Sequence, residues 1–382
     1  MTFAAALAAT FVVALVYGVL APLAPGLAGM HMASDSGPYA FHTGAVTGTY
    51  LIAFAMAAPL WGRVAEARRR STLAAAGLVG LAIALGAMAF TDTAAALYVS
   101  AGLAGFAAGA IAPAVQLGAT LMEGSQRKVR FLTSISIASF AGWFLGPVLA
   151  SEARAIRGLD GNAGAPVLFL VATLAILVAF WCARAGGAAD STRAVDGPAS
   201  SPAAWTLPAL TFAVAFAIGA FEISLILWSQ QVLRMEAAFT SRLLLACTLV
   251  MALTQAVLVF VPLARPRWSA AGAAVLFGLL APAIAVNAWW PRPDTAFISV
   301  AVFAILATVL QAMLSLGTIE TAGARPGSRI GLQLSLASAG QGGGSLAAAS
   351  AFTASGGGFY LAAALAVAAA ALAWLRPVRM EP

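Results

Sequence analysis

Long apolar stretches alternate with short polar gaps along the whole chain. Each stretch is long enough to cross a hydrocarbon core of about 30 Å as an α-helix. The pattern therefore predicts an all-α membrane protein with twelve transmembrane helices. The stretches lie near residues 4–24, 43–61, 72–91, 95–121, 131–150, 165–183, 206–228, 242–263, 269–289, 296–318, 330–350 and 358–375.

Positive charge is confined almost entirely to the gaps, and mostly to every second gap. Fifteen of the twenty Lys and Arg residues follow the second, fourth, sixth, eighth or tenth stretch or lie in the C-terminal tail. The other five lie in the remaining gaps. Loops that carry positive charge stay in the cytoplasm. We therefore expect a bacterial inner-membrane protein whose N- and C-termini are both cytoplasmic.

The composition agrees with a chain that lies in the bilayer throughout. Hydrophobic residues make up 62% of the chain and charged residues 9%, whereas a soluble domain carries about 25% charged residues. The net charge of +7 lies in short loops beside helix ends, where it sets topology and contacts anionic lipid headgroups. We therefore expect the lipid bilayer, and no nucleic acid, as the partner of these charges.

A polar segment divides the apolar stretches into two groups of six. It is rich in Ala, Gly, Ser and Pro, which is typical of a flexible linker. The two halves also share short matches at a nearly constant offset: Gly18 corresponds to Gly219, and Ser136 to Ser335. These matches indicate a duplicated six-helix unit, an arrangement that places a substrate site near the membrane midplane. The predicted organisation is an N-terminal six-helix bundle at 1–183, a cytoplasmic linker at 184–204 and a C-terminal six-helix bundle at 205–382.

The gap after the second stretch combines a glycine, an acid and an arginine at regular spacing. Gly62 permits close packing at a helix end, and Glu66 can accept bonds from backbone N–H groups at the start of a neighbouring helix. Arg70 can pair with an acid at another helix end, such as Glu123. Glu320 would take part in a similar pairing in the second half. We interpret this set as a cytoplasmic gate, although membrane topology alone would explain the arginine.

This gap resembles the G-x-L-a-D-r-x-G-r-r signature between the second and third helices of the major facilitator superfamily. Gly62, Glu66 and Arg70 match in kind, whereas Arg69 stands where the signature has glycine and Ala67 where it has arginine. The resemblance implies two pseudo-symmetric six-helix bundles, the major facilitator fold. It also implies transport by alternating access.

The fifth stretch carries Gly142, Gly146 and Pro147 in a G-x-x-x-G-P pattern. It resembles the motif in the fifth helix of the drug and metabolite:proton antiporters of that superfamily. Two small residues four apart let another helix approach closely, and proline bends a helix. Ordinary helix packing would give the same spacing. One departure is that the stretch 100–106 lacks the arginine often found in the fourth helix of such exporters.

Glu222 is the acid that lies well inside an apolar stretch. A charged side chain at the centre of a membrane helix costs about 2.5–3.5 kcal/mol on insertion scales. We expect Glu222 to couple transport to protons or to bind a cationic substrate. The alternative is a neutral glutamic acid that forms a hydrogen bond with a neighbouring helix.

Other polar or aromatic residues within the stretches are candidates for the lining of a substrate cavity. Each of them could instead be a link between helices. His42, beside the first outer gap, is expected to be solvated. The glycines Gly340, Gly342, Gly343 and Gly344 are expected either to let their helix bend or to pack closely against a helix of the other half. The cavity candidates are Tyr17, Gln116, Trp143, Gln255, Gln311, Gln333 and Gln341.

These features favour a secondary active transporter of a small organic molecule, most simply a proton-coupled exporter. An importer of a nutrient or siderophore-like solute with the same fold is the alternative, and a non-transporting membrane scaffold or sensor is a more remote one. The sequence has no catalytic triad, metal-ligand cluster or nucleotide-binding loop. We therefore expect a monomer without enzymatic activity, cofactor or metal.

Overall fold

The residues that the structure describes form twelve α-helices. The structure is a computed structural model that describes residues 1–29, 38–120, 122, 125–155, 164–186, 206–260, 270–320, 326–352 and 357–375. Over these ranges the regular elements are helices and there is no strand, which confirms the predicted all-α fold. The helices are α1 (Phe3–Gly29), α2 (Pro38–Ala67), α3 (Arg70–Ala89), α4 (Ala94–Thr120), α5 (Ser125–Ala155), α6 (Gly164–Arg184), α7 (Thr206–Gln231), α8 (Ala237–Phe260), α9 (Ala270–Trp289), α10 (Pro293–Glu320), α11 (Pro326–Ser350) and α12 (Gly357–Leu375).

Eleven of these helices are long and apolar enough to cross a membrane, as judged over the described residues. A membrane helix satisfies its backbone polar groups internally, which an apolar segment in lipid requires. Helix α11 is the exception because glycine, serine and glutamine lower its apolarity. The chain is a multi-pass integral membrane protein.

Proline marks the start of several helices. Pro38, Pro293 and Pro326 are the first residues of α2, α10 and α11. At that position the missing N–H costs nothing, because the first N–H groups of a helix have no partner within it. Helices α2 and α3 are separated by a short break at Arg68 and Arg69, so most of the segment that resembles the family signature, from Gly62 to Ala67, is the last part of α2, and Arg70 begins α3.

The contacts within the chain define two units. Unit 1 comprises Met1–Asp196 and Arg325–Ser335, and unit 2 comprises Gly197–Ala324 and Leu336–Pro382. The first ten residues of α11 therefore belong to unit 1 and the rest of that helix to unit 2. The predicted linker at 184–204 lies mostly outside the described residues, so the boundaries of the two bundles stay a prediction.

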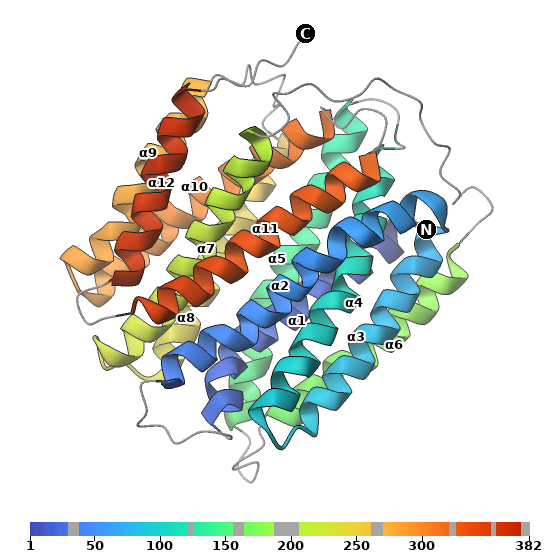
Figure 1. The fold of residues 1–382 in the computed structure, drawn as a ribbon, viewed down its shortest axis with the longest axis horizontal. Coiled ribbons are helices and arrows are strands. Elements are labelled where there is room, and N and C mark those ends of the chain that lie inside the picture. The colour runs from blue at the N-terminus through green and yellow to red at the C-terminus, as the bar shows by residue number, and fades with distance from the viewer. Residues whose placement is uncertain are drawn as a thin grey trace. The chain divides into compact units, whose positions relative to one another are not determined.

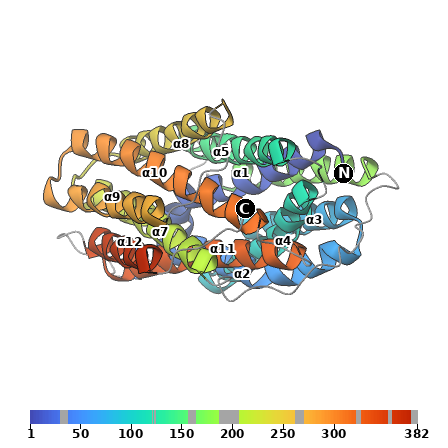
Figure 2. The ribbon, with the colours of Figure 1, turned by 90° about the horizontal axis from the view of Figure 1, so that it is seen from above.

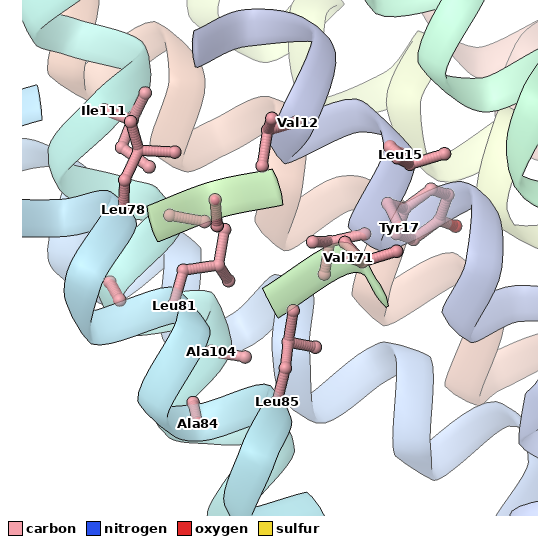
Figure 3. Packing of buried hydrophobic residues seen from close by; sticks show 14 of the residues in the cluster. Val12, Leu15, Tyr17, Leu78, Leu81, Ala84, Leu85, Ala104, Ile111 and Val171 are labelled. Carbon is pink, nitrogen blue, oxygen red and sulfur yellow. The ribbon is translucent and has the colours of Figure 1, made fainter. Parts of the chain in front are cut away.

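Unit 1 is built from helix pairs that are distant in sequence. Helix α2 packs against α4, α1 against α5, and α3 against both α4 and α6 (Figure 1). The leucines of α3 fill the space among these helices. Figure 3 shows Leu78 facing Ile111 of α4, and Leu85 extending toward Val171 of α6. All four side chains are buried.

Unit 2 repeats this pattern of pairs. Helix α9 packs against α12, which lies beside it in both views (Figure 1, Figure 2). Helix α8 pairs with α10, α7 with α12, and α9 with α10. Each of these pairs corresponds to a pair of unit 1 whose helix numbers are six lower. The correspondence is the structural counterpart of the sequence offset, and it supports the duplication.

Glycines let α1 and α5 touch through their backbones in unit 1. A Cβ atom added to Gly142 would lie 2.5 Å from the carbonyl oxygen of Phe11, and one added to Gly146 would overlap the backbone of Gly18. Helix pairs in lipid gain little from the hydrophobic effect, so close backbone approach is a main source of their attraction. The G-x-x-x-G spacing on α5 therefore has a direct role in packing.

The same contact joins α7 and α11 in unit 2. A Cβ atom on Gly219 would overlap the carbonyl oxygen of Gln341, and one on Gly340 or Gly344 would overlap carbonyl oxygens of α7. The sequence offered bending, or packing against a helix of the other half, for this glycine-rich part of α11, but the close contacts of Gly340 and Gly344 are with α7. Its partner is α7, within the same unit, because duplication reproduced the glycine contact of α1 and α5.

We expect the substitution Gly146→Ala to lower the free energy of unfolding by about 1–3 kcal/mol, the usual range for overpacking. The added methyl group would meet the backbone of Gly18, which cannot rotate away. The matched control is Gly86→Ala on α3, because a Cβ atom there meets nothing within 4 Å. Thermal unfolding of the purified variants in detergent measures both. Equal unfolding temperatures would contradict the importance of the α1–α5 contact.

Candidate functional site

Three aromatic side chains from three helices meet in unit 1, and we call Tyr17, Tyr50 and Trp143 the aromatic cluster. The ring of Tyr17 on α1 lies 6.2 Å from that of Tyr50 on α2 and 6.1 Å from that of Trp143 on α5, centroid to centroid. Tyr17 is 8% exposed and Tyr50 2%, whereas Trp143 is half-buried. Two predicted cavity residues, Tyr17 and Trp143, are thus in contact.

Backbone contacts hold the aromatic cluster in place. Gly18, next to Tyr17, allows Trp143 to approach so closely that an added Cβ atom would lie 3.0 Å from the Trp143 Cα atom. On the other side, the backbone of Tyr50 lies against Gly105 of α4, where a Cβ atom would overlap the Tyr50 carbonyl oxygen. The glycines therefore fix the backbone positions from which the three rings project, and the rings from α1, α2 and α5 meet one another.

The hydroxyl group of Tyr50 is buried and has no hydrogen-bond partner among the described residues. Leaving a buried polar group without a partner costs about 1–3 kcal/mol. The sequence analysis missed this residue. Its signal was a tyrosine within an apolar stretch, the same signal that singled out Tyr17.

Glu222 lies on α7 in unit 2 and is half-buried. Its position relative to α8 follows from a hydrogen bond between Ser229 and Thr240, whose hydroxyl oxygens are 2.7 Å apart. Glu222 lies two helical turns before Ser229, and Cys247 lies two turns after Thr240. Because α7 and α8 are antiparallel, Glu222 and Cys247 face each other.

The five glutamines predicted to line a cavity are spread over both units. Gln116 and Gln333 lie in unit 1, and Gln255, Gln311 and Gln341 in unit 2. Gln255 and Gln333 are buried, and the other three are half-buried. Their role in a cavity stays a prediction.

The end of α2 packs against the first turn of α11 within unit 1, and we call this contact the α2–α11 junction. A Cβ atom on Gly62 would lie 2.5 Å from the carbonyl oxygen of Gly327, and one on Gly331 would lie 2.7 Å from that of Ala58. Glu66 accepts a hydrogen bond from the backbone N–H of Ser328 at 3.0 Å. The carboxylate thus bonds to the start of a neighbouring helix, where the helix dipole favours negative charge.

Arg70 begins α3 and is buried against the end of α4. It is 9% exposed, and a Cβ atom on Gly118 would lie 3.1 Å from its Nη1 atom. Positive charge at the C-terminal end of a helix is favourable. Its predicted partner Glu123 lies outside the described residues, as does the side chain of Glu320, the last residue of α10.

His42 is not a solvated loop residue. It lies within α2, half-buried, and its Nδ1 atom forms a hydrogen bond with the hydroxyl group of Tyr98 on α4. The two rings stack with centroids 6.0 Å apart. The expectation failed because α2 begins at Pro38, several residues before the apolar stretch from which its start was predicted.

Comparisons with known proteins give no match at the level of sequence families. No family description matches the sequence, and no curated protein matches it either. Among solved structures, the crystal structure of the human organic anion transporter MFSD10 (TETRAN) is similar with a TM-score of 0.79. The alignment covers 97% of this chain and 98% of that chain, at 17% sequence identity.

The chain has the major facilitator fold. The α2–α11 junction includes the end of α2, which carries the first residues of the segment that resembles the family signature. Of the residues that match the signature, Gly62 and Glu66 both contact the first turn of α11. The departures at Ala67 and Arg69 fall beside this contact, where both side chains are exposed.

We expect Glu66→Ala to lower the free energy of unfolding by about 0.5–2 kcal/mol, the usual effect of removing a side chain that caps a helix. Glu66→Gln keeps an acceptor for the Ser328 N–H and loses only the charge, so its effect should be smaller. Glu152→Ala, at an exposed acid of α5, is the control. Chemical denaturation in detergent measures all three, and a Glu66→Ala protein as stable as the control would contradict the capping role.

Proposed function

We propose that this protein is a secondary active transporter that moves a small organic molecule across the membrane by alternating access. We further propose that it is a proton-coupled exporter of the bacterial inner membrane, that it acts as a monomer, and that both termini are cytoplasmic. The major facilitator fold supports transport, and the alternation of basic gaps supports the orientation. The two halves of the mechanism are the predicted bundles at 1–183 and 205–382.

The position of Glu222 within an apolar helix is the observation that supports proton coupling. It is half-buried in an apolar helix, where ionisation is costly. A carboxyl group in such a place can lose and regain its proton as its surroundings alternate between the two sides of the membrane. Proton binding and substrate movement would be linked because both depend on the same change of state.

The α2–α11 junction supports a gating role for Gly62, Glu66 and Arg70. The bond from Ser328 to Glu66 joins the end of α2 to the start of α11, and Gly62 and Gly331 let the two backbones lie close together. We propose that this contact holds one state of the transporter and separates when the other state forms. Glu123 and Glu320 are proposed to pair with basic residues at the same side of the membrane.

The proposed substrate is lipophilic or weakly polar, because few charged side chains lie within the spans. The similar human protein is named as an organic anion transporter, so an anion belongs among the compounds to be tested. Export is proposed from the resemblance of Gly142, Gly146 and Pro147 to the antiporter motif. Helix α11 has the same glycine contact without the proline, so helix packing alone explains the glycines of α5. Import of a nutrient or siderophore-like solute is therefore the second candidate.

We expect purified protein in lipid vesicles to move a lipophilic dye in response to an imposed pH gradient. The cationic dye rhodamine 6G, the anionic dye fluorescein and the uncharged antibiotic chloramphenicol cover the three charge classes. Glu222→Gln cannot release a proton, so its transport should no longer be accelerated by the gradient. Glu236→Gln, at an exposed acid between α7 and α8, should behave like the wild type.

Three outcomes separate the parts of this proposal. Transport of none of the compounds by the wild type would contradict a transporter of lipophilic solutes. Transport that Glu222→Gln performs at the wild-type rate, with the wild-type response to the gradient, would exclude the coupling role of Glu222. The direction of the gradient that accelerates efflux from vesicles of known protein orientation decides between export and import.

A further inference from the structure

We propose that the aromatic cluster binds the substrate, and that the substrate carries an uncharged hydrogen-bonding group which the Tyr50 hydroxyl contacts. The substrate class is a flat aromatic compound with a hydroxyl, carbonyl or amide group. This inference rests on the proposed transport function and goes beyond it, because it names the chemistry that is recognised and the residue that recognises it.

The unpartnered hydroxyl is the first step of the argument. Tyr50 is 2% exposed, and its hydroxyl group has no hydrogen-bond partner among the described residues. Buried polar groups of proteins are nearly always paired, so an exception at an aromatic cluster calls for a ligand that supplies the partner. A hydroxyl group both donates and accepts, so it suits a phenol, a carbonyl or an amide equally well.

The shape of the cluster is the second step. Tyr17 contacts both Tyr50 and Trp143 in tilted arrangements with centroids about 6 Å apart, and Phe140 meets Trp143 edge to face. Tilted and offset rings favour a further flat ring, because each ring presents either a negative face or a positive edge. Trp143 is the half-buried member, so a ligand would approach past it and reach Tyr50 last.

The absence of nearby charge is the third step. Helix α1 contains no charged residue, and the nearest Asp, Glu, Lys or Arg residues of α2 and α5 are nine or more positions from Tyr50 or Trp143. Nine residues correspond to roughly 13 Å along a helix. A charged ligand group at the cluster would lose its hydration without gaining a counter-charge, which is unfavourable. The group that contacts Tyr50 is therefore uncharged.

The rigidity of the surroundings is the fourth step. Backbone contacts at Gly18, Gly105 and Gly142 leave no space for a side chain larger than hydrogen. They fix the spacing of α1 and α5, which carry Tyr17 and Trp143, and that of α2 and α4 beside Tyr50. A binding site needs its contact groups held in place before the ligand arrives, since ordering them on binding would weaken affinity.

The test compares two probes that differ in one group, 2-naphthol and 2-methylnaphthalene. The two have nearly the same shape, and only 2-naphthol forms a hydrogen bond. Binding of the tritiated probes is measured on wild-type protein in lipid nanodiscs and corrected for empty nanodiscs. We expect Tyr50→Phe to weaken binding of 2-naphthol about three- to tenfold, the worth of one hydrogen bond, and to leave binding of 2-methylnaphthalene unchanged.

Two further variants distinguish binding from structure. Tyr360→Phe removes a hydroxyl group from a 41% exposed residue of α12 and should change the affinity for neither probe. Trp143→Leu removes a stacking surface and should weaken both probes to the same extent. The unfolding temperature of Tyr50→Phe should equal or exceed that of the wild type, because no hydrogen bond within the protein is lost.

The inference is overturned if Tyr50→Phe leaves the ratio of the two affinities unchanged, or if neither probe binds to the wild type. It is also overturned if Tyr50→Phe unfolds at a lower temperature, because the hydroxyl group would then have a partner within the protein. These results leave the proposed function intact as long as the wild type transports dye. Failure of dye transport, with normal binding of 2-naphthol, would instead contradict the proposed function and retain the site.

Discussion

Direct backbone contact between helices at glycine is the constraint on which the rest of this structure depends. In water, burial of apolar surface draws helices together, but lipid is as apolar as the helix surface. Packing must then come from close fit and from the few polar groups present. Gly146 against Gly18 in unit 1, and Gly219 against Gln341 in unit 2, provide that fit, because a side chain at Gly146 or Gly219 would collide with backbone atoms.

The glycine contacts also determine where chemistry is possible. They place Trp143 beside Tyr17, and on the opposite side of Tyr50 they fix α2 against α4. A polar side chain among these apolar, closely packed helices has few possible hydrogen-bond partners, so whether it has one bears on its role. Ser229 and Thr240 pair with each other, and Asn287 donates a hydrogen bond to Ser299. The Tyr50 hydroxyl group has no hydrogen bond among the described residues. Glu222 is an ionisable side chain on an apolar helix.

Sequence patterns were sufficient to predict the helices and the internal repeat. The length of an apolar stretch is set by bilayer thickness, so the helix count follows from hydropathy alone. The family resemblance at Gly62 and Glu66 also led to a contact that the structure contains, because a carboxylate near a helix start has one favourable place to bond. The offset between Gly18 and Gly219 pointed to equivalent contacts in the two units.

Other features could not be predicted because they depend on which helices become neighbours. Nothing in the order of residues shows that Tyr50 lies beside Tyr17, or that His42 meets Tyr98 across two helices. The partner of the glycines at 340–344 was misjudged for the same reason. Glu222 stood out in the sequence because it is an acid within an apolar stretch. That Cys247 lies opposite it follows only from the register of α7 and α8.

The most direct test of the account is whether substrate movement carries protons. Vesicles containing the wild-type protein and a trapped pH-sensitive dye, pyranine, would be mixed with the transported compound at equal pH on both sides. We predict that the luminal pH rises as the compound enters, because an antiporter releases protons from the lumen in exchange for the entering compound, and that the change stops when the compound is equilibrated. Passage of the compound with no change in pyranine fluorescence would contradict proton-coupled transport.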